Sequence, residues 1–264
     1  MMRMTVMLVL MACTGGVACA VVDPPLPAPF DDPAAVAGAP PLEVVAPDRF
    51  KLGEIQIDRT EVTVRLPARI NMSEGLIEYA LVHGAGKLHE ALLKTEVKPF
   101  DLQLAMLLLG FEATGEPLRE QGDPMAPKGT PVMVEVEWRQ DGAMKKTRLE
   151  EWILNKTSDS GMANTAWIYT GSVIHEGVFM AQVEGSIIAV YHDPLAMIDN
   201  PSPGGGNDEI WYVRRGVVPA AGTEVTVLIS RIKDGVKSDA PAEPPPDPSD
   251  PVVNPIDPAW EEEP

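Results

Sequence analysis

The stretch "LGEIQIDRTEVTVRLPARI", residues 52–70, alternates apolar and polar side chains and decides the fold class. Ile55 and Ile57 flank a polar residue, and the alternation resumes in "VTVRL", residues 62–66. A period of two is typical of a half-buried β-strand, and Asp58-Arg59 between the two runs is typical of a tight turn. The stretch therefore predicts a β-hairpin with one face in a core.

Similar patterns continue along the chain. Apolar runs from Leu76 to Val82 and from Leu88 to Thr95 flank Gly84-Ala85-Gly86, which predicts a second hairpin. A third is expected around the turn Asp141-Gly142, between a strand from Val132 to Trp138 and a strand that runs toward Arg148. Further strands are expected over "TAWIYTG", "GVFMAQ", "SIIAVYH" and "TEVTVLISRI", and residues 200–208, "NPSPGGGND", have the composition of a flexible loop.

One helix interrupts these strands. Pro99 fits the first turn of a helix, "FDLQLAMLLL" supplies an apolar body, and Gly110 fits the position just past its end. The sum predicts one α+β domain over residues 50–237, made mostly of antiparallel β-sheet hairpins with one principal α-helix packed on the sheet.

The N-terminus predicts export. Residues 1–20 carry Arg3, an apolar run from Thr5 to Ala12 and small residues ending in "ACA", the pattern of a secretory signal peptide. The run is far shorter than the roughly 20 residues that span a bilayer, so no transmembrane segment is expected in the mature chain. The expected location is the periplasm, the cell envelope or the extracellular space.

Both cysteines, Cys13 and Cys19, lie in this leader. Cleavage after Ala20 would leave no cysteine, so the mature chain would have no disulfide, no thiolate metal site and no cysteine nucleophile. Lipidation at either cysteine is the alternative: "LMAC" ends at Cys13 and "GVAC" at Cys19, and each resembles a lipobox. The sequence leaves a lipid anchor and ordinary secretion both open.

The segments that flank the domain are rich in proline. Residues 21–49 are expected to form an extended Pro/Ala-rich linker, and residues 238–264 a disordered acidic tail with Trp260 as a candidate docking residue. The whole chain has a formal net charge of −18. Because binding to nucleic acid requires clustered Lys and Arg, this charge excludes a nucleic-acid partner and disfavours anionic membrane surfaces.

Three pieces of the chain resemble the YdjY-domain family of bacterial exported or lipid-anchored proteins. They are the G-x-x-H-E step from Gly86 to Glu90, the Pro99 helix ending in Leu109-Gly110, and "WIYTGS" from Trp167 to Ser172. The resemblance implies an extracytoplasmic location and supplies no activity. Some relatives carry a ferredoxin-like label, but a cluster needs four cysteines or equivalent ligands, so we expect no cofactor.

The stretch "VHGAGKLHEALLKT", residues 82–95, holds the candidate functional cluster His83, Lys87, His89 and Glu90. A zincin motif is absent, because Leu93 stands where H-E-x-x-H requires its second histidine. Three alternatives remain: a metal site in which His83 and His89 recruit Glu90, His175 or His192, a structural turn with polar contacts, or a tip that recognises a ligand.

Two other segments hold candidates. Ser172 and His175 are close in sequence, but "GSVIHEG" is not the G-x-S-x-G elbow of a serine hydrolase. We expect no catalytic residue there, and Trp167 and Ser172 are instead candidates for ligand contact. His192 and Asp193 in "YHDP" are a candidate cation site.

The sequence thus predicts an exported cell-envelope protein that acts as a non-catalytic binding or accessory module. Its expected partner is another envelope protein or a small ligand. The alternative is an extracytoplasmic metal-binding protein or enzyme that uses the hairpin tip with His83, His89 and Glu90.

Overall fold

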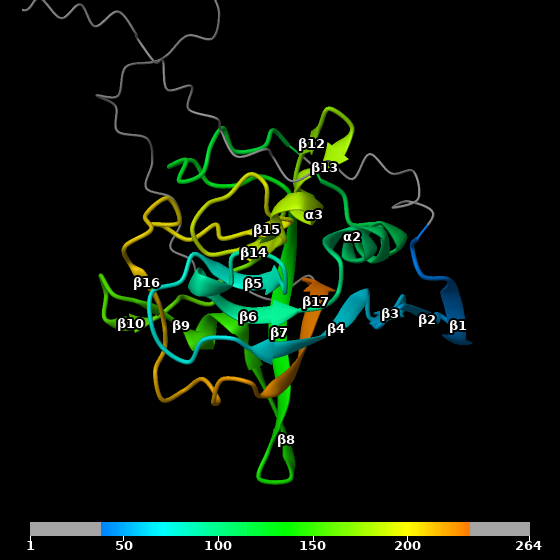
Figure 1. The fold of residues 1–264 in the computed structure, drawn as a ribbon, viewed down its shortest axis with the longest axis horizontal. Helices are drawn as coiled ribbons and strands as arrows, with labels where there is room; N and C mark the ends of the chain where they lie inside the picture. The colour runs from blue at the N-terminus through cyan, green and yellow to red at the C-terminus, as the bar shows by residue number, and fades with distance from the viewer. Residues whose placement is uncertain (1–37, 114, 233–264) are drawn as a thin grey trace, which may run out of the picture.

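The computed structural model describes residues 38–113 and 115–232, which are mostly β-strand (Figure 1). The expected α+β class is wrong, because the described residues are only 11 % helical and form a closed barrel of eight strands with extra strands attached. The sequence shows which side chains alternate, but not that the last strand of a sheet returns to pair with the first. That closure makes the fold all-β.

The barrel closes because β6 pairs with β4 as well as with β5. Its strands, in order around the ring, are β4 (Thr63–Ile70), β17 (Glu224–Arg231), β7 (Thr130–Gln140), β11 (Trp167–Tyr169), β15 (Ile198–Asp199), β14 (Ser186–Ala189), β5 (Tyr79–His83) and β6 (Ala91–Thr95). Alternate side chains of these strands form one continuous buried core that includes Leu66, Leu81, Val134, Val136, Trp167, Ile188, Val227 and Ile229. The interior is therefore packed with side chains.

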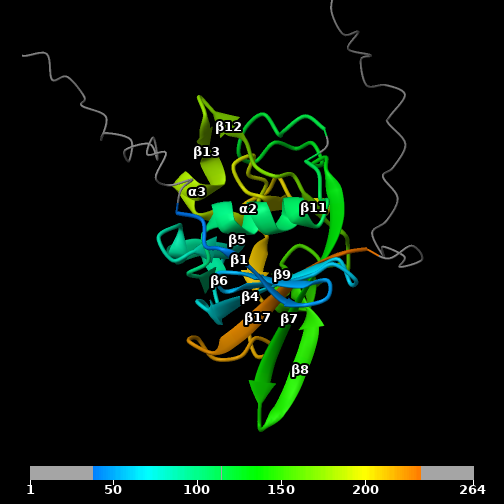
Figure 2. The same cartoon turned by 90° about the vertical axis from the view of Figure 1, so that its right-hand side faces the viewer.

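The helix α2 (Pro99–Leu108) forms where the sequence places it, with Pro99 in its first turn and Gly110 at a φ of 72° just past its end. It contacts α3 (Met180–Glu184) and β3 (Ile55–Asp58), and lies across one side of the barrel (Figure 2). The helix covers a part of the barrel and is not the second layer of an α+β domain.

The expected second hairpin is wrong, because β5 and β6 run parallel. Residues 84–90 carry the chain back to the start of β6 through a turn and the short 3₁₀ helix η1 (Leu88–Glu90). An extended chain covers about 3.3 Å per residue, so this connection is long enough to return along β5, which has 5 residues. Nothing in an apolar–Gly–apolar pattern distinguishes this return from a hairpin.

A three-stranded extension projects from the barrel beside β4 (Figure 1). It consists of β1 (Leu42–Ala46), β2 (Arg49–Leu52) and β3, each antiparallel to the next. The hairpin expected over residues 52–70 is confirmed as β3 and β4. Strand β1 lies within the range 21–49 for which we expected a linker.

The third hairpin is also confirmed. Strands β7 and β8 (Ala143–Arg148) are antiparallel, and Asp141 and Gly142 between them have φ angles of 51° and 79°. The hairpin projects from the opposite side of the barrel to β12 (Ile174–His175) (Figure 1).

Short elements complete the fold. The 3₁₀ helix η2 (Leu149–Trp152) follows β8, and a small sheet contains β9 (Ile153–Asn155), β10 (Ser160–Gly161) and β16 (Trp211–Val213). Strand β12 pairs with β13 (Val178–Phe179). The strand expected over "GVFMAQ" is therefore only partly correct, because α3 begins at Met180.

Several predictions lie outside the described residues: the signal peptide, Cys13 and Cys19 in it, most of the linker, and the acidic tail with Trp260. Within residues 38–113 and 115–232, no helix has the length and apolar character needed to span a membrane.

Candidate functional site

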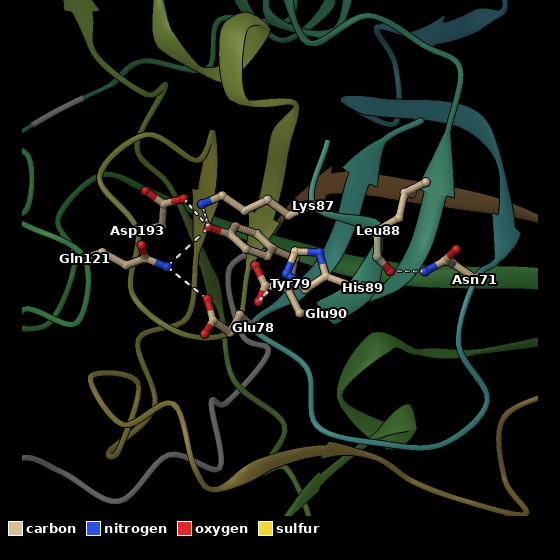
Figure 3. Close-up of polar contacts among 9 residues, drawn as sticks. All are labelled: Asn71, Glu78, Tyr79, Lys87, Leu88, His89, Glu90, Gln121 and Asp193. Carbon is tan, nitrogen blue, oxygen red and sulfur yellow. Dashed lines mark hydrogen bonds and ion pairs between the residues drawn. The ribbon is translucent and has the colours of Figure 1, made fainter. Parts of the chain in front are cut away.

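The structure separates the side chains of the candidate cluster. Lys87 points toward the buried Tyr79, with its Nζ 5.0 Å from the centre of the ring (Figure 3). The His89 imidazole is 79 % exposed and lies beside the neighbouring Glu90, with 3.4 Å between Nε2 and Oε2. Lys87 and His89 are two residues apart in the sequence but have different surroundings, because one contacts the Tyr79 ring and the other is exposed to solvent.

Tyr79 is the centre of the polar contacts on this side of the barrel. The Lys87 ammonium donates a hydrogen bond to the Tyr79 hydroxyl at 2.7 Å, and that hydroxyl donates to Asp193 Oδ2 at 2.7 Å. The Gln121 amide donates to the same hydroxyl at 3.4 Å and to Glu78 Oε2 at 3.0 Å (Figure 3). The network joins β5, the β5–β6 connection, and the loops around Gln121 and Asp193.

Electrostatics keep the phenol protonated. Burial and then the nearby Asp193 carboxylate raise the pKa of Tyr79 far above its ordinary value of 10. Burial also raises the pKa of Glu78, and the charge of Glu90 adds to that shift while Lys87 opposes it. Tyr79 therefore acts as a hydrogen-bond donor and not as a base, and the network holds loops in place.

The histidines are not brought together as ligands. His83 Nδ1 accepts the backbone N–H of Ala85 at 3.2 Å, and no contact joins His83 to His89 or Glu90. Among the described residues, no group of three or more His, Cys, Asp or Glu side chains is arranged to hold a metal ion. The turn is also supported from outside by Asn71, whose amide donates to the carbonyls of Leu88 and Ala91 (Figure 3).

Trp167 and Ser172, the two candidates for ligand contact, have structural roles in the fold. Trp167 has no exposed surface and is part of the core. Ser172, at a φ of 60°, donates to the Leu195 carbonyl at 2.6 Å and accepts the N–H of Ala181 at 3.1 Å. His175 is exposed in β12, and no contact joins it to Ser172.

His192 contacts two loops, those of Asp123 and Asn200, whose proximity the sequence did not predict. Its ring is 2 % exposed, with Nδ1 2.6 Å from the Asp123 carbonyl and Nε2 2.7 Å from the Asn200 carbonyl. Each ring nitrogen faces a carbonyl oxygen at hydrogen-bond distance, so neither points at an open position where a cation could bind. Asp193 is likewise engaged by Tyr79 and by the N–H of Leu195.

Asp199 is a buried carboxyl that sequence reasoning missed. It has no exposed surface, and its two oxygens accept the backbone N–H groups of Asp193 at 3.0 Å and Asn200 at 2.7 Å. Burial raises its pKa well above the ordinary value of 3.8, the nearby Asp193 adds to the shift, and the two N–H donors oppose it. No motif in "AMIDN" distinguishes this aspartate from an exposed one.

The raised pKa gives a pH-dependent prediction for Asp199→Asn. The folded chain binds this proton more tightly than the unfolded chain, so the resulting stabilisation is complete below pH 3.8 and is lost as pH rises through the folded pKa. The amide does not titrate, so the variant should gain free energy of unfolding relative to wild type as pH rises from 4 to 7. Urea unfolding at each pH measures the difference.

Asp123→Asn is the control with the opposite sign. Backbone N–H donors of Arg119 and Met125 lower the pKa of Asp123, so its stabilisation is present above the unfolded pKa and is lost as pH falls. This variant should lose stability relative to wild type as pH rises from about 2 to about 5, mostly below the range in which Asp199→Asn changes, so its measurement starts at the lower pH. A constant difference between Asp199→Asn and wild type over the whole range would contradict the account.

A groove of about 570 Å³ lies on the outer face of the barrel, across β6, β4, β17, β7 and the start of β8. We call it the outer groove; it is lined by Glu54, Pro67, Ala68, Arg69, Lys94, Thr95, Glu96, Glu137, Trp138, Arg139, Met144, Glu224, Val225 and Thr226. The strand register places Arg69 opposite both Lys94 and Glu224, so charged side chains of three strands share one row. The alternating pattern of the sequence can indicate which residues face outward. It cannot indicate that they line a groove.

Some charges in the outer groove are engaged and others are free. Arg69 pairs with Glu224 at 2.6 Å, and Glu137 pairs with Arg65. Within the described part of the chain, Glu54, Lys94 and Glu96 have no ion-pair partner. The groove thus presents both a cation and carboxylates that can contact a ligand.

Comparisons with known proteins identify a family. The family model of the YdjY domain matches residues 55–230 of the 264-residue chain. No curated protein and no solved structure matches the chain.

Proposed function

The chain belongs to the YdjY-domain family, and we propose that it is an exported, non-catalytic binding module of the cell envelope. Export is supported by the leader at residues 1–20, whose charged start, apolar run and small-residue end fit a secretory signal. The binding role is supported by the distribution of free polar groups over the barrel.

The observation that carries the proposal is the contrast between the Tyr79 network and the outer groove. Around Tyr79, the phenol and Asp193 are buried, and the polar groups of the network satisfy one another, so they have little to offer a substrate. In the outer groove, Lys94 and Glu96 are without ion-pair partners among the described residues, and the half-buried Trp138 and the exposed Met144 line the same groove. Unsatisfied charges beside apolar surface are what a binding site offers.

The chemistry of the outer groove points to a polar ligand that carries groups of both signs. An exposed peptide segment of another envelope protein has this chemistry, because it offers backbone donors and acceptors together with charged side chains. Lys94 would take a carboxylate of that segment, and Glu54 or Glu96 would take a cation. The apolar floor between these charges would contact the aliphatic parts.

Site-specific photo-crosslinking in cells that produce the full-length chain tests this function. A benzophenone side chain at Met144, which is 59 % exposed beside the outer groove, should give a discrete adduct with one envelope protein in the extracytoplasmic fraction. The same side chain at Ile174, which is 74 % exposed in β12, is the control and should give none. A chain found in the cytoplasm, or equal labelling from both positions, would contradict the proposal.

A further inference from the structure

We propose that the free edge of β1 pairs with β1 of a second copy, so that two chains form a symmetric dimer through one continuous antiparallel sheet. Strand β1 ends the twelve-stranded sheet and pairs only with β2 within the described residues. Its other edge therefore presents backbone N–H and C=O groups that a further strand can use. In Figure 1 this strand lies at the far end of the extension, away from the barrel.

Three of the five side chains of β1 are large, apolar and exposed. Leu42, Val44 and Val45 are 46 %, 74 % and 66 % exposed, and the strand contains neither lysine nor proline. Lysine and proline are residues with which natural proteins protect the free edge of a sheet. The free edge of β8 shows this protection, because Lys145 and Lys146 lie in the strand. Strand β1 has a bulge between Val44 and Ala46 but no lysine, so its exposed apolar side chains leave this edge less protected than that of β8.

The exposed residues continue a face that is buried in the rest of the extension. The register places Leu42 opposite Leu52 and Val44 opposite Phe50, and the row continues to Ile57 of β3. Leu52 and Ile57 are buried, whereas Leu42 and Val44 at the end of the row are not. A further strand beside β1 would extend this apolar face and cover both residues.

The sequence of β1 is complementary to itself in one register. A two-fold axis at Val44 places Val44 of the two copies opposite each other and Leu42 opposite Ala46 of the second copy. Glu43 then faces Val45 of the second copy, and its charge already lies beside Lys51 of β2. An axis at Glu43 would instead oppose two carboxylates, which is unfavourable. The preferred register therefore brings no like charges into direct opposition.

The ends of the strand limit the pairing to two copies. Pro40 and Pro41 precede the strand, Pro47 follows it, and a bulge at Val45 interrupts the pairing with β2. A two-fold arrangement also uses both free β1 edges, so it closes as a dimer instead of growing into a fibre. A pair of five-residue strands gives a contact below the roughly 1,200–2,000 Å² of a stable interface, so the dimer should be weak.

Sedimentation of the full-length chain tests the dimer. The average mass of wild type should rise toward that of a dimer with concentration, and more so at higher salt, because the net charge of −18 repels the copies. Val44→Lys and Val44→Glu each put like charges face to face at the axis, so each should raise the dissociation constant by roughly tenfold or more. Mixed in equal amounts, the two variants should associate again, to within about threefold of wild type.

Met144→Lys on the free edge of β8 is the matched control and should leave the dimer unchanged. Because Val44 is 74 % exposed, its variants should unfold at the wild-type temperature, which separates loss of pairing from loss of folding. A wild-type chain that stays monomeric would overturn the proposal. So would a dimer that Val44→Lys does not weaken, or variants that fail to associate when mixed.

Discussion

Replacing Gly205 by alanine should lower the free energy of unfolding by about 3 kcal/mol. A Cβ atom at this position would lie 2.1 Å from His192 Nε2 and 2.6 Å from Cδ2, so the imidazole would have to move. That ring lies between the carbonyls of Asp123 and Asn200, at 2.6 and 2.7 Å, and moving it breaks the contacts that join the two loops. Chemical denaturation at pH 7 measures the loss.

A double-mutant cycle separates this clash from a general effect on the loop. Once His192→Ala has removed the ring, Gly205→Ala should cost little more, so the two losses should be far from additive. Gly161→Ala is the control, because the atom nearest to its Cβ would be the end of the flexible Arg214 side chain at 3.0 Å. Additive losses from His192→Ala and Gly205→Ala would show that the ring does not connect the loops.

Tyr79→Phe should lower the free energy of unfolding by about 2 kcal/mol, with little change in shape. The phenol is the donor to Asp193, which is 2 % exposed, and the acceptor for Lys87. Without it, a buried carboxylate keeps only the backbone N–H of Leu195. Thermal or urea unfolding gives the magnitude, and a crystal structure of the variant would show whether the loops keep their places.

Tyr169→Phe is the matched control for this change. Its hydroxyl is also buried in the barrel but donates to Gln103 Oε1 at 2.8 Å, a neutral acceptor. Hydrogen bonds to charged partners are stronger than those to neutral ones, so the Tyr169 variant should lose about half as much. Equal losses would mean that the Lys87–Tyr79–Asp193 network contributes no more than an ordinary buried hydroxyl.

Local patterns predicted the local elements and missed the closure of the barrel. Two hairpins, β3–β4 and β7–β8, and the helix that begins at Pro99 depend on interactions between residues that are close in sequence. The alternating pattern, the turn Asp141-Gly142 and the helix end at Gly110 were therefore enough to predict them. The pairing of β6 with β4 and the parallel course of β5 and β6 depend on contacts between distant segments. The α+β class was wrong for that reason.

The sequence likewise indicated some residues of the candidate site but not their partners. Lys87 stood out because it lies among two histidines and a glutamate, yet its partner Tyr79 is an ordinary residue of an apolar run. Asp193 lies 114 positions from Tyr79, and no spacing rule connects them. His192 was noticed as a candidate cation ligand, but its two carbonyl partners lie in loops whose approach only the fold reveals.

The most direct measurement of binding in the outer groove is the yield of the Met144 crosslink in a Lys94→Glu chain. Lys94 lines the groove without an ion-pair partner among the described residues, so reversing its charge should greatly reduce the adduct without unfolding the barrel. Lys145→Glu makes the same change of charge on β8 outside the lining and should leave the yield at the wild-type value. An adduct that survives Lys94→Glu unchanged would show that the groove does not hold the partner.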